Sequence, residues 1–172
     1  GEACELGANK LIEVNSTIIG GSKTVPWAAD AYVLNCLGAL HTPLKQYPLA
    51  QAKTQDLTRR ISNTATDVAD NYAESILNAC GLLDVLERVS LYQERSSGVM
   101  SHDPSLTLDI ISKALQGLVE SAKDGAPDFQ EVQSPRVRLD IQNRFSNRLI
   151  EAYTRVYIAV LNPNAGYGSN AR

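Results

Sequence analysis

The sequence has little of what nucleic-acid-binding and membrane-spanning proteins require. Aromatic residues make up 6% of its 172 residues and the formal net charge is only −3. Stacking rings are therefore scarce, and the chain has no general attraction for nucleic acid or an anionic membrane. Its most apolar stretch, residues 76–86, is interrupted by Asn78 and Asp84 and is shorter than the roughly 20 residues of a membrane span. This composition is typical of a soluble globular protein.

Cysteine is also scarce and occurs at scattered positions. An odd count with wide spacing makes a poor disulfide framework and favours a reducing compartment. The glycosylation-type triplet Asn15-Ser16-Thr17 has meaning only in a secreted chain, so we expect it to be unused. The three cysteines are Cys4, Cys36 and Cys80.

Histidine is limited to His41 and His102, and neither has a partner at the spacing of a metal site. We therefore predict no metal site and no cofactor. The segment Gly20-Gly21-Ser22-Lys23 lacks the preceding strand of a phosphate-binding loop and is interpreted as a connector.

No group of residues predicts catalysis. Ser97, Ser101, His102 and Asp103 include the residue types of a hydrolytic triad, but neighbours on one polar loop are more simply turn and cap residues. Asp67 and Asp70, which lie one turn apart on a helix, are more simply part of a solvated face. We predict no catalytic residue and no enzymatic activity.

Apolar residues recur at steps of three or four along most of the chain, which predicts helices with one buried face. Helix-stopping and helix-starting residues divide the pattern into about five helices at residues 4–19, 26–47, 49–93, 103–123 and 134–162. The third is the longest, and a bend or break is expected at Gly81. In the fourth, Asp103 is expected to cap a helix with Pro104 at its first position. The residues expected on buried faces include Leu40, Ala79 and Ile110.

The last helix has the clearest boundaries. Ser134 can cap its first turn, Pro135 suits its first position, and Asn162-Pro163 ends it. About 28 residues at about 1.5 Å each form a rod on the order of 40 Å long. Its expected buried stripe consists of Val137, Ile141, Phe145, Leu149, Ala152, Val156 and Val160.

Credible strands are absent from the pattern, so the predicted fold is all-α, an antiparallel bundle of about five helices. We expect residues 1–172 to form a single domain. The chain begins without a basic start and apolar core, so we expect no signal peptide. Its helix-like start at Glu2 is expected of a fragment of a longer chain.

One side of the last helix carries mostly basic residues with acids interspersed. A salt-bridged solvent face is the favoured interpretation. The alternative is a docking face for an acidic helix of a partner. Its candidate binding residues are Arg136, Arg144, Arg148 and Arg155, with Asp140 and Glu151 between them.

Residues 150–167 read Ile-Glu-Ala-Tyr-Thr-Arg-Val-Tyr-Ile-Ala-Val-Leu-Asn-Pro-Asn-Ala-Gly-Tyr. This segment resembles the end of the sixth subunit of the conserved oligomeric Golgi complex, a vesicle-tethering assembly with helical-rod subunits. Weaker matches at residues 31–37, 82–89 and 106–119 fall in the expected order, so the resemblance extends from Trp27 to Tyr167. The chain departs from the family pattern after Tyr167, at residues 168–172.

The resemblance implies a non-catalytic module at the end of a helical rod, acting in intra-Golgi retrograde transport. The implied partners are sister subunits of the tethering complex and Golgi SNARE proteins. The implied location is the cytoplasmic face of the Golgi, with indirect membrane association through the complex. Neither nucleic acid nor a cofactor is implied.

Two other classes of protein stay open. One is a scaffold or adaptor of another complex with the same bundle. The other is a helical enzyme or ligand carrier, whose pocket would draw polar groups from Tyr72, Tyr153 or Tyr157. We expect these tyrosines instead to be core residues with satisfied hydroxyl groups.

Overall fold

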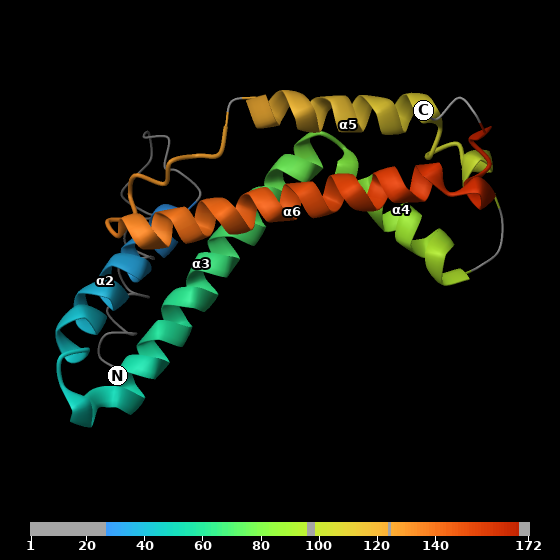
Figure 1. Ribbon diagram of the computed structural model, residues 1–172. Helices are drawn as coiled ribbons and strands as arrows, with labels where there is room; N and C mark the ends of the chain where they lie inside the picture. Colours follow the sequence, from blue (N-terminus) through green and yellow to red (C-terminus); the bar gives the residue numbers. More distant parts are fainter. Residues whose placement is uncertain (1–26, 96–98, 124, 169–172) are drawn as a thin grey trace. The chain divides into compact units, whose positions relative to one another are not determined.

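The computed structural model describes residues 27–95, 99–123 and 125–168, and of residues 93–95 the backbone only. These residues form five α-helices without a strand, which confirms the all-α prediction (Figure 1). The expected helix at 4–19, the triplet at Asn15 and the connector at Gly20 lie outside the described residues. The helices are α2 (Ala28–Leu44), α3 (Gln51–Ala79), α4 (Leu82–Arg95), α5 (Leu108–Lys123) and α6 (Pro135–Leu161), with 3-10 turns η1 (Pro48–Ala50), η2 (Met100–His102) and η3 (Pro163–Ala165).

The chain divides into two compact units, to which α3 and α6 both contribute. Of the described residues, the first unit contains those from Trp27 to Val68 together with Asp128–Ile141. The second contains the described residues of Ala69–Pro127 and those from Gln142 to Gly168. Each unit is described below by itself, and the single domain expected from the sequence stays a prediction.

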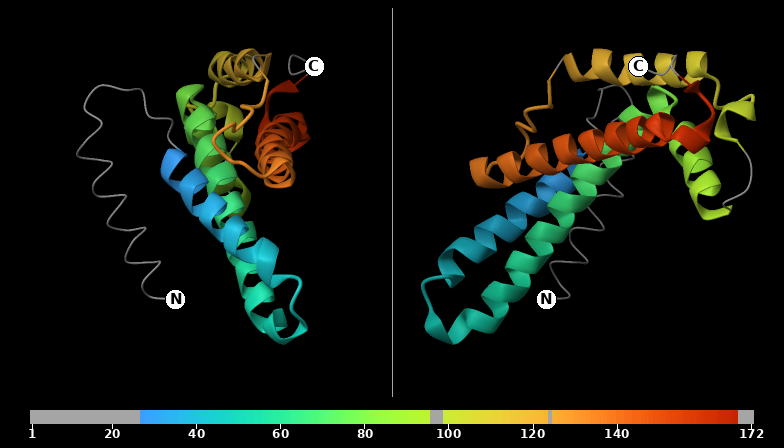
Figure 2. Two further views of the ribbon diagram at one scale, coloured as in Figure 1. Left: turned by 90° about the vertical axis from the view of Figure 1, so that its left-hand side faces the viewer. Right: turned by 45° about the vertical axis from the view of Figure 1, so that its right-hand side comes forward.

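In the first unit, α2 and the first part of α3 form an antiparallel pair (Figure 2). The Thr58 hydroxyl and His41 Nε2 are 3.1 Å apart and join the two helices. The Asn35 side chain donates to the Glu131 carbonyl at 2.8 Å and accepts from the Gln133 N–H at 2.8 Å, so it holds the segment before α6 against α2. The buried apolar residues of this unit are Ala31, Leu34, Leu57, Ala65, Val68, Phe129, Val132 and Ile141.

The prediction that Leu40 lies on the buried face of α2 is wrong, because this residue is 46% exposed. Successive steps of three residues drift around a helix that has 3.6 residues per turn. The inward positions after Leu34 are therefore Gly38 and His41, which are both partly buried.

The long apolar stretch breaks where it was expected to, at Gly81. The helix α3 ends at Ala79, and Gly81 has a φ of 75°, the left-handed conformation that glycine adopts without steric cost. Ala79, expected on the buried stripe, is exposed because it lies at this turn, whereas Ala73 and Leu77 are buried on the preceding turns.

The start of α5 differs from the sequence-based expectation. Asp103 does not cap a helix: its carboxylate accepts from the Ser105 N–H at 2.8 Å in a local turn. Thr107 caps α5 instead, accepting from the Ile110 N–H at 3.4 Å. With the helix in this register Ile111 is buried, and Ile110, expected in the core, is 43% exposed.

The last helix agrees with its predicted boundaries, Pro135 and Leu161 being its first and last residues. The Ser134 hydroxyl lies 3.5 Å from the Val137 N–H that it was expected to cap. In the second unit, Phe145 packs against Tyr72 of α3 with ring centroids 5.2 Å apart. The buried apolar residues of this unit are Ala69, Ala73, Leu77, Leu82, Val85, Leu86, Val89, Met100, Leu106, Ile111, Ala114, Leu118, Phe145, Leu149, Ala152, Val156, Ala159, Ala165 and Tyr167.

Candidate functional site

The four arginines of the candidate face come from one helix but belong to both units. Arg136 lies in the first unit, where it is exposed. Arg144, Arg148 and Arg155 lie in the second, where Arg148 bonds to α3 and Arg155 to α4. Their role in binding a partner stays a prediction.

Arg148 forms a bidentate pair with Asp70 of α3. Its Nε and Nη2 donate to the two carboxylate oxygens at 2.7 and 2.9 Å, and Nη1 lies 3.5 Å from Glu151. The hydrogen bond from Arg148 lowers the pKa of Asp70, and the positive charges of Arg148 and Arg144 lower it further. Most of the hydrogen-bonding capacity of Arg148 is therefore used inside the unit.

Arg155 makes a weaker contact with α4. Its Nη2 donates to the Ser90 hydroxyl at 2.9 Å, and that hydroxyl donates to the Leu86 carbonyl at 2.8 Å. That partner is a neutral hydroxyl, and Arg155 has no ion-pair partner within the part of the chain that the structure describes.

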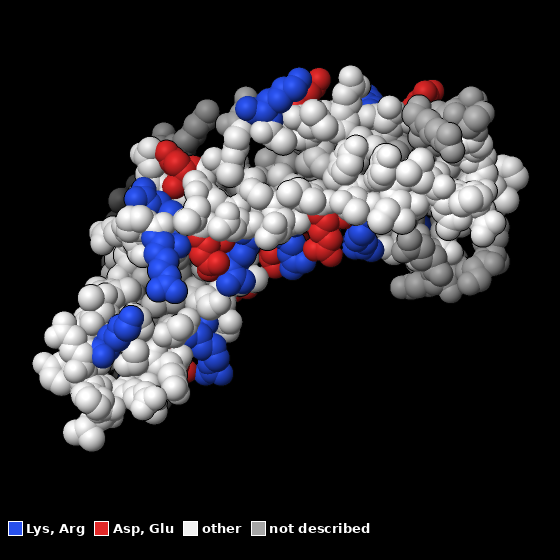
Figure 3. Space-filling view, in the orientation of Figure 1, with Lys and Arg blue, Asp and Glu red and all other residues white. Residues whose placement is uncertain are grey.

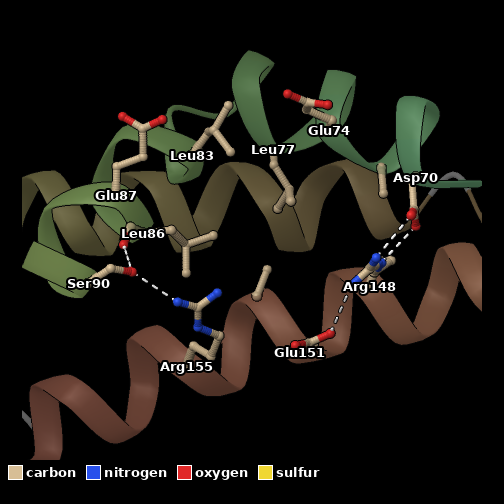
Figure 4. Close-up of a pocket in the computed structure, with 12 residues that line it drawn as sticks. Asp70, Glu74, Leu77, Leu83, Leu86, Glu87, Ser90, Arg148, Glu151 and Arg155 are labelled. Carbon is tan, nitrogen blue, oxygen red and sulfur yellow. Dashed lines mark hydrogen bonds and ion pairs between the residues drawn. The ribbon is translucent and has the colours of Figure 1, made fainter. Parts of the chain in front are cut away.

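A groove of about 410 Å³ lies between these two contacts. Figure 4 shows Arg148 bonded to Asp70 on one side of it and Arg155 bonded to Ser90 on the other, with leucines of α3 and α4 between them. All of its lining residues belong to the second unit. They are Asp70, Ala73, Glu74 and Leu77 of α3, Leu83, Leu86, Glu87 and Ser90 of α4, and Arg148, Glu151, Ala152 and Arg155 of α6.

A separate stripe on the second half of α6 is exposed and carries no charge. It consists of Ile150, Tyr153, Tyr157 and Leu161, which are 62, 39, 47 and 42% exposed. The two tyrosine rings stack with centroids 6.0 Å apart. Viewed from the side where α6 lies in front, a band without charged groups covers this half of the helix (Figure 3).

The tyrosines expected in the core therefore have different environments. Tyr72 is partly buried against Phe145, as expected of a core residue, whereas Tyr153 and Tyr157 are exposed. These two follow the helical period of the buried stripe but lie on another side of α6.

The residues that the sequence suggested for catalysis or metal binding include Ser97 and Asp103. Ser97 is outside the described residues. Asp103 lies 3.6 Å from Arg88 and accepts from the Tyr92 hydroxyl at 3.4 Å, in addition to its turn. Across residues 27–95, 99–123 and 125–168, no group of three or more His, Cys, Asp and Glu side chains is placed to hold a metal ion. None of the helices in these ranges is both long and apolar enough to span a membrane.

The closing segment of the resemblance, residues 162–167, has a structural role in the second unit. The Asn162 side chain accepts from the Asn164 N–H at 3.0 Å and starts η3. Gly166 has a φ of 84°, and a Cβ there would lie 2.2 Å from a methyl carbon of Val99. The buried Tyr167 then donates its hydroxyl to the Leu106 carbonyl at 2.5 Å. We call these contacts the C-terminal clasp.

Burial shapes the chemistry of the clasp. It raises the pKa of Tyr167 to about 12, with smaller contributions from Asp103 and Tyr92. A phenol that stays neutral and donates to a buried carbonyl stabilises the fold, which is a structural function.

Comparison with known proteins agrees with the resemblance. A family model described as "Conserved Oligomeric Golgi complex subunit 6, C-terminal" matches residues 2–172. The conserved oligomeric Golgi complex subunit 6 of Arabidopsis thaliana is 28% identical over 138 residues, which cover 79% of this chain and 20% of the relative. The subunit 6 of Cryptococcus neoformans is 22% identical over 168 residues, which cover 96% of this chain and 22% of the relative.

The chain thus spans about a fifth of the length of these curated relatives. No solved structure matches it. Because the family model covers nearly every residue, the chain belongs to the family of C-terminal regions of conserved oligomeric Golgi complex subunit 6.

Proposed function

We propose that this chain is a non-catalytic helical module of a Golgi vesicle-tethering complex that works through protein–protein contacts. The observation that carries the proposal is the family match over residues 2–172. In this proposal the full-length protein binds sister subunits and Golgi SNARE proteins in intra-Golgi retrograde transport. It acts at the cytoplasmic face of the Golgi membrane, with which it associates peripherally through the complex.

The uncharged stripe on α6 supports contact with another protein. The cores of protein interfaces are depleted in charged residues and enriched in aromatic ones. Tyr153 and Tyr157 offer large rings whose hydroxyl groups tolerate water, and Ile150 and Leu161 extend the apolar surface on either side. A contiguous exposed apolar surface of this kind is typical of an interaction site.

The arginine face is proposed as a second contact surface, for an acidic helix. Arg155 is its strongest candidate because its hydrogen-bond acceptor among the described residues is a neutral hydroxyl, whereas Arg148 already forms a bidentate pair with Asp70. Arg136 and Arg144 complete the proposed set. A charge at the rim of an interface affects the association rate and its salt dependence more than the final affinity.

Affinity capture of the full-length protein from a membrane-containing lysate, followed by mass spectrometry, tests this function. We expect recovery of the other subunits of the Golgi tethering complex. Recovery of the protein alone, or with unrelated complexes, would contradict the assignment and favour an adaptor of another assembly.

A matched pair of variants then tests the uncharged stripe. Tyr153→Ser combined with Tyr157→Ser should reduce the recovery of partners with only a small loss in the unfolding midpoint, because the two residues are 39 and 47% exposed. The control is Leu49→Ser, which also removes an exposed apolar side chain but on η1 in the first unit. Equal losses in both variants would argue against a specific role for the stripe.

A further inference from the structure

The groove of the second unit has an apolar floor between two polar bridges. The floor includes Ala73, Leu77 and Leu86, which are 2, 8 and 8% exposed. The bridges are the Arg148–Asp70 pair and the Arg155–Ser90 hydrogen bond. Because Arg148 and Arg155 are seven residues apart on α6, about 10 Å of helix separates the bridges. That length accommodates the apolar side chains from one or two turns of a docked helix.

The rim of the groove is acidic. Four carboxylates and two guanidinium groups line it, which is a net formal charge of −2. Asp70 is neutralised by Arg148, but Glu74 and Glu87 are exposed and have no ion-pair partner among the described residues. Figure 4 shows both on the α3 and α4 side of the groove. Such a rim repels phosphate, anionic lipid and nucleic acid and attracts lysine and arginine.

We propose that this groove binds a basic amphipathic helix of a partner protein. One or two leucine, isoleucine or methionine side chains of that helix insert between the bridges. Its lysine or arginine side chains, on the edge that faces α3 and α4, pair with Glu74 and Glu87. The inference rests on the proposed function, in which the chain acts by contacting proteins, and it assigns the chemistry of one partner.

The groove shares Arg148 and Arg155 with the arginine face, but it adds an apolar floor and the carboxylates of α3 and α4. The arginine face would bind an acidic helix, whereas the groove selects a basic one because its unpaired charges are mostly carboxylates. The uncharged stripe lacks the charges that would select either sign. Binding in the groove also needs both features together, since a basic peptide without apolar anchors leaves the floor exposed to water.

Titration of the full-length protein with two labelled synthetic helices tests the proposal. Both peptides have 18 residues with the same leucine stripe, and their polar faces consist of lysine in one and glutamate in the other. We expect the lysine peptide to bind and Glu74→Lys with Glu87→Lys to weaken it by about tenfold or more. Leu83→Ser, which leaves the charges in place, should weaken it by about threefold or more. The glutamate peptide should not bind the groove.

The matched control is Asp109→Lys with Glu120→Lys, the same change of charge at exposed positions of α5 outside the groove. It should leave the affinity within about twofold. Equal weakening by both charge reversals would show attraction to net charge alone and overturn the proposal, as would an unchanged affinity in Leu83→Ser. Glu74→Gln with Glu87→Gln is the milder variant if the reversals alter the circular dichroism spectrum, and unchanged binding to that variant also overturns the proposal.

Two other results identify a different occupant and overturn the proposal. One is tighter binding of the glutamate peptide that Leu83→Ser weakens, which would place an acidic helix in the groove. The other is a concentration-dependent dimer that Leu83→Ser dissociates, which would place a second copy of this chain in the groove. The capture experiment distinguishes failure of the groove proposal from failure of the proposed function. If the tethering subunits are recovered but the lysine peptide does not bind, only the groove proposal is refuted. If the subunits are not recovered, the proposed function is refuted.

Discussion

Tyr167→Phe removes one hydrogen bond from the C-terminal clasp and leaves its packing in place. Tyr167 is 8% exposed, and its hydroxyl donates to the carbonyl of Leu106, a residue with no exposed surface. Phenylalanine keeps the ring but leaves that carbonyl without this donor. The net loss of such a bond, with some unmet desolvation, corresponds to about 1–2 kcal/mol of unfolding free energy.

Urea unfolding followed by circular dichroism measures this change. The control is Tyr157→Phe, which removes the hydroxyl of a ring that is 47% exposed and should change the unfolding free energy by less than about 0.5 kcal/mol. Tyr167→Ala also removes the buried ring and should lose about 3–5 kcal/mol. Losses of similar size in the Tyr167→Phe and Tyr157→Phe variants would refute the assigned role of the buried hydroxyl.

The same residue predicts a dependence on alkaline pH. The fold raises the pKa of Tyr167 from its ordinary value of 10.0 to about 12. Between these values the unfolded chain loses this proton while the folded chain keeps it, so stability falls as pH rises. The contribution is complete below pH 10 and is lost by about pH 12.

Tyr167→Phe should remove this part of the slope, whose upper limit is about 1.4 kcal/mol per pH unit. The comparison of the two proteins cancels the titration of the other groups. Parallel stability curves for the wild type and Tyr167→Phe above pH 10 would show that the phenol is not held neutral by the clasp.

Three further changes test other parts of the second and first units. Phe145→Asp places a charge at a 5% exposed position and should unfold or loosen the bundle. The free energy of unfolding should fall by at least about 3 kcal/mol, and the near-ultraviolet circular dichroism signal should be lost. A native spectrum would contradict the assignment of Phe145 to the core. Arg148→Glu should lower the free energy of unfolding by only about 1 kcal/mol, because the ion pair with Asp70 is partly exposed. Since the fold lowers the pKa of Asp70, this difference from the wild type should shrink as the pH falls below 3.8. Asp30→Asn should stabilise the chain slightly at pH 7, by less than about 1 kcal/mol, because burial and the nearby Asp67 raise the pKa of Asp30; urea unfolding at pH 7 would show a lower midpoint if the carboxylate were instead stabilising.

Local signals in the sequence were reliable where the structure depends on neighbouring residues. Ser134 and Pro135 begin α6 as expected, and Gly81 marks the end of α3 because it adopts a left-handed conformation. The same kind of reasoning failed at Asp103, although aspartate is a favoured residue at the N-cap of a helix. Its carboxylate instead accepts from the N–H two residues on, and this turn competes with helix capping.

The candidate site depended more on long-range contacts. Glu74, Glu87 and Arg155 come from three different helices, and their spacing in the sequence gives no sign that they line one groove. Arg148 was recognised as part of a charged face, but its partner Asp70 is 78 residues away. Such pairs are set by how the helices pack, which local periodicity does not determine.

The sequence by itself determined the helical class, most helix boundaries and the apolar stripe of α6 through Phe145 and Leu149. A second stripe through Tyr153 and Tyr157 also follows the helical period of that helix, but these tyrosines were expected in the core. Only the tertiary structure decided that the first is buried and the second exposed. The reason is that periodicity reports which residues share a side of a helix, whereas burial depends on which side the other helices cover.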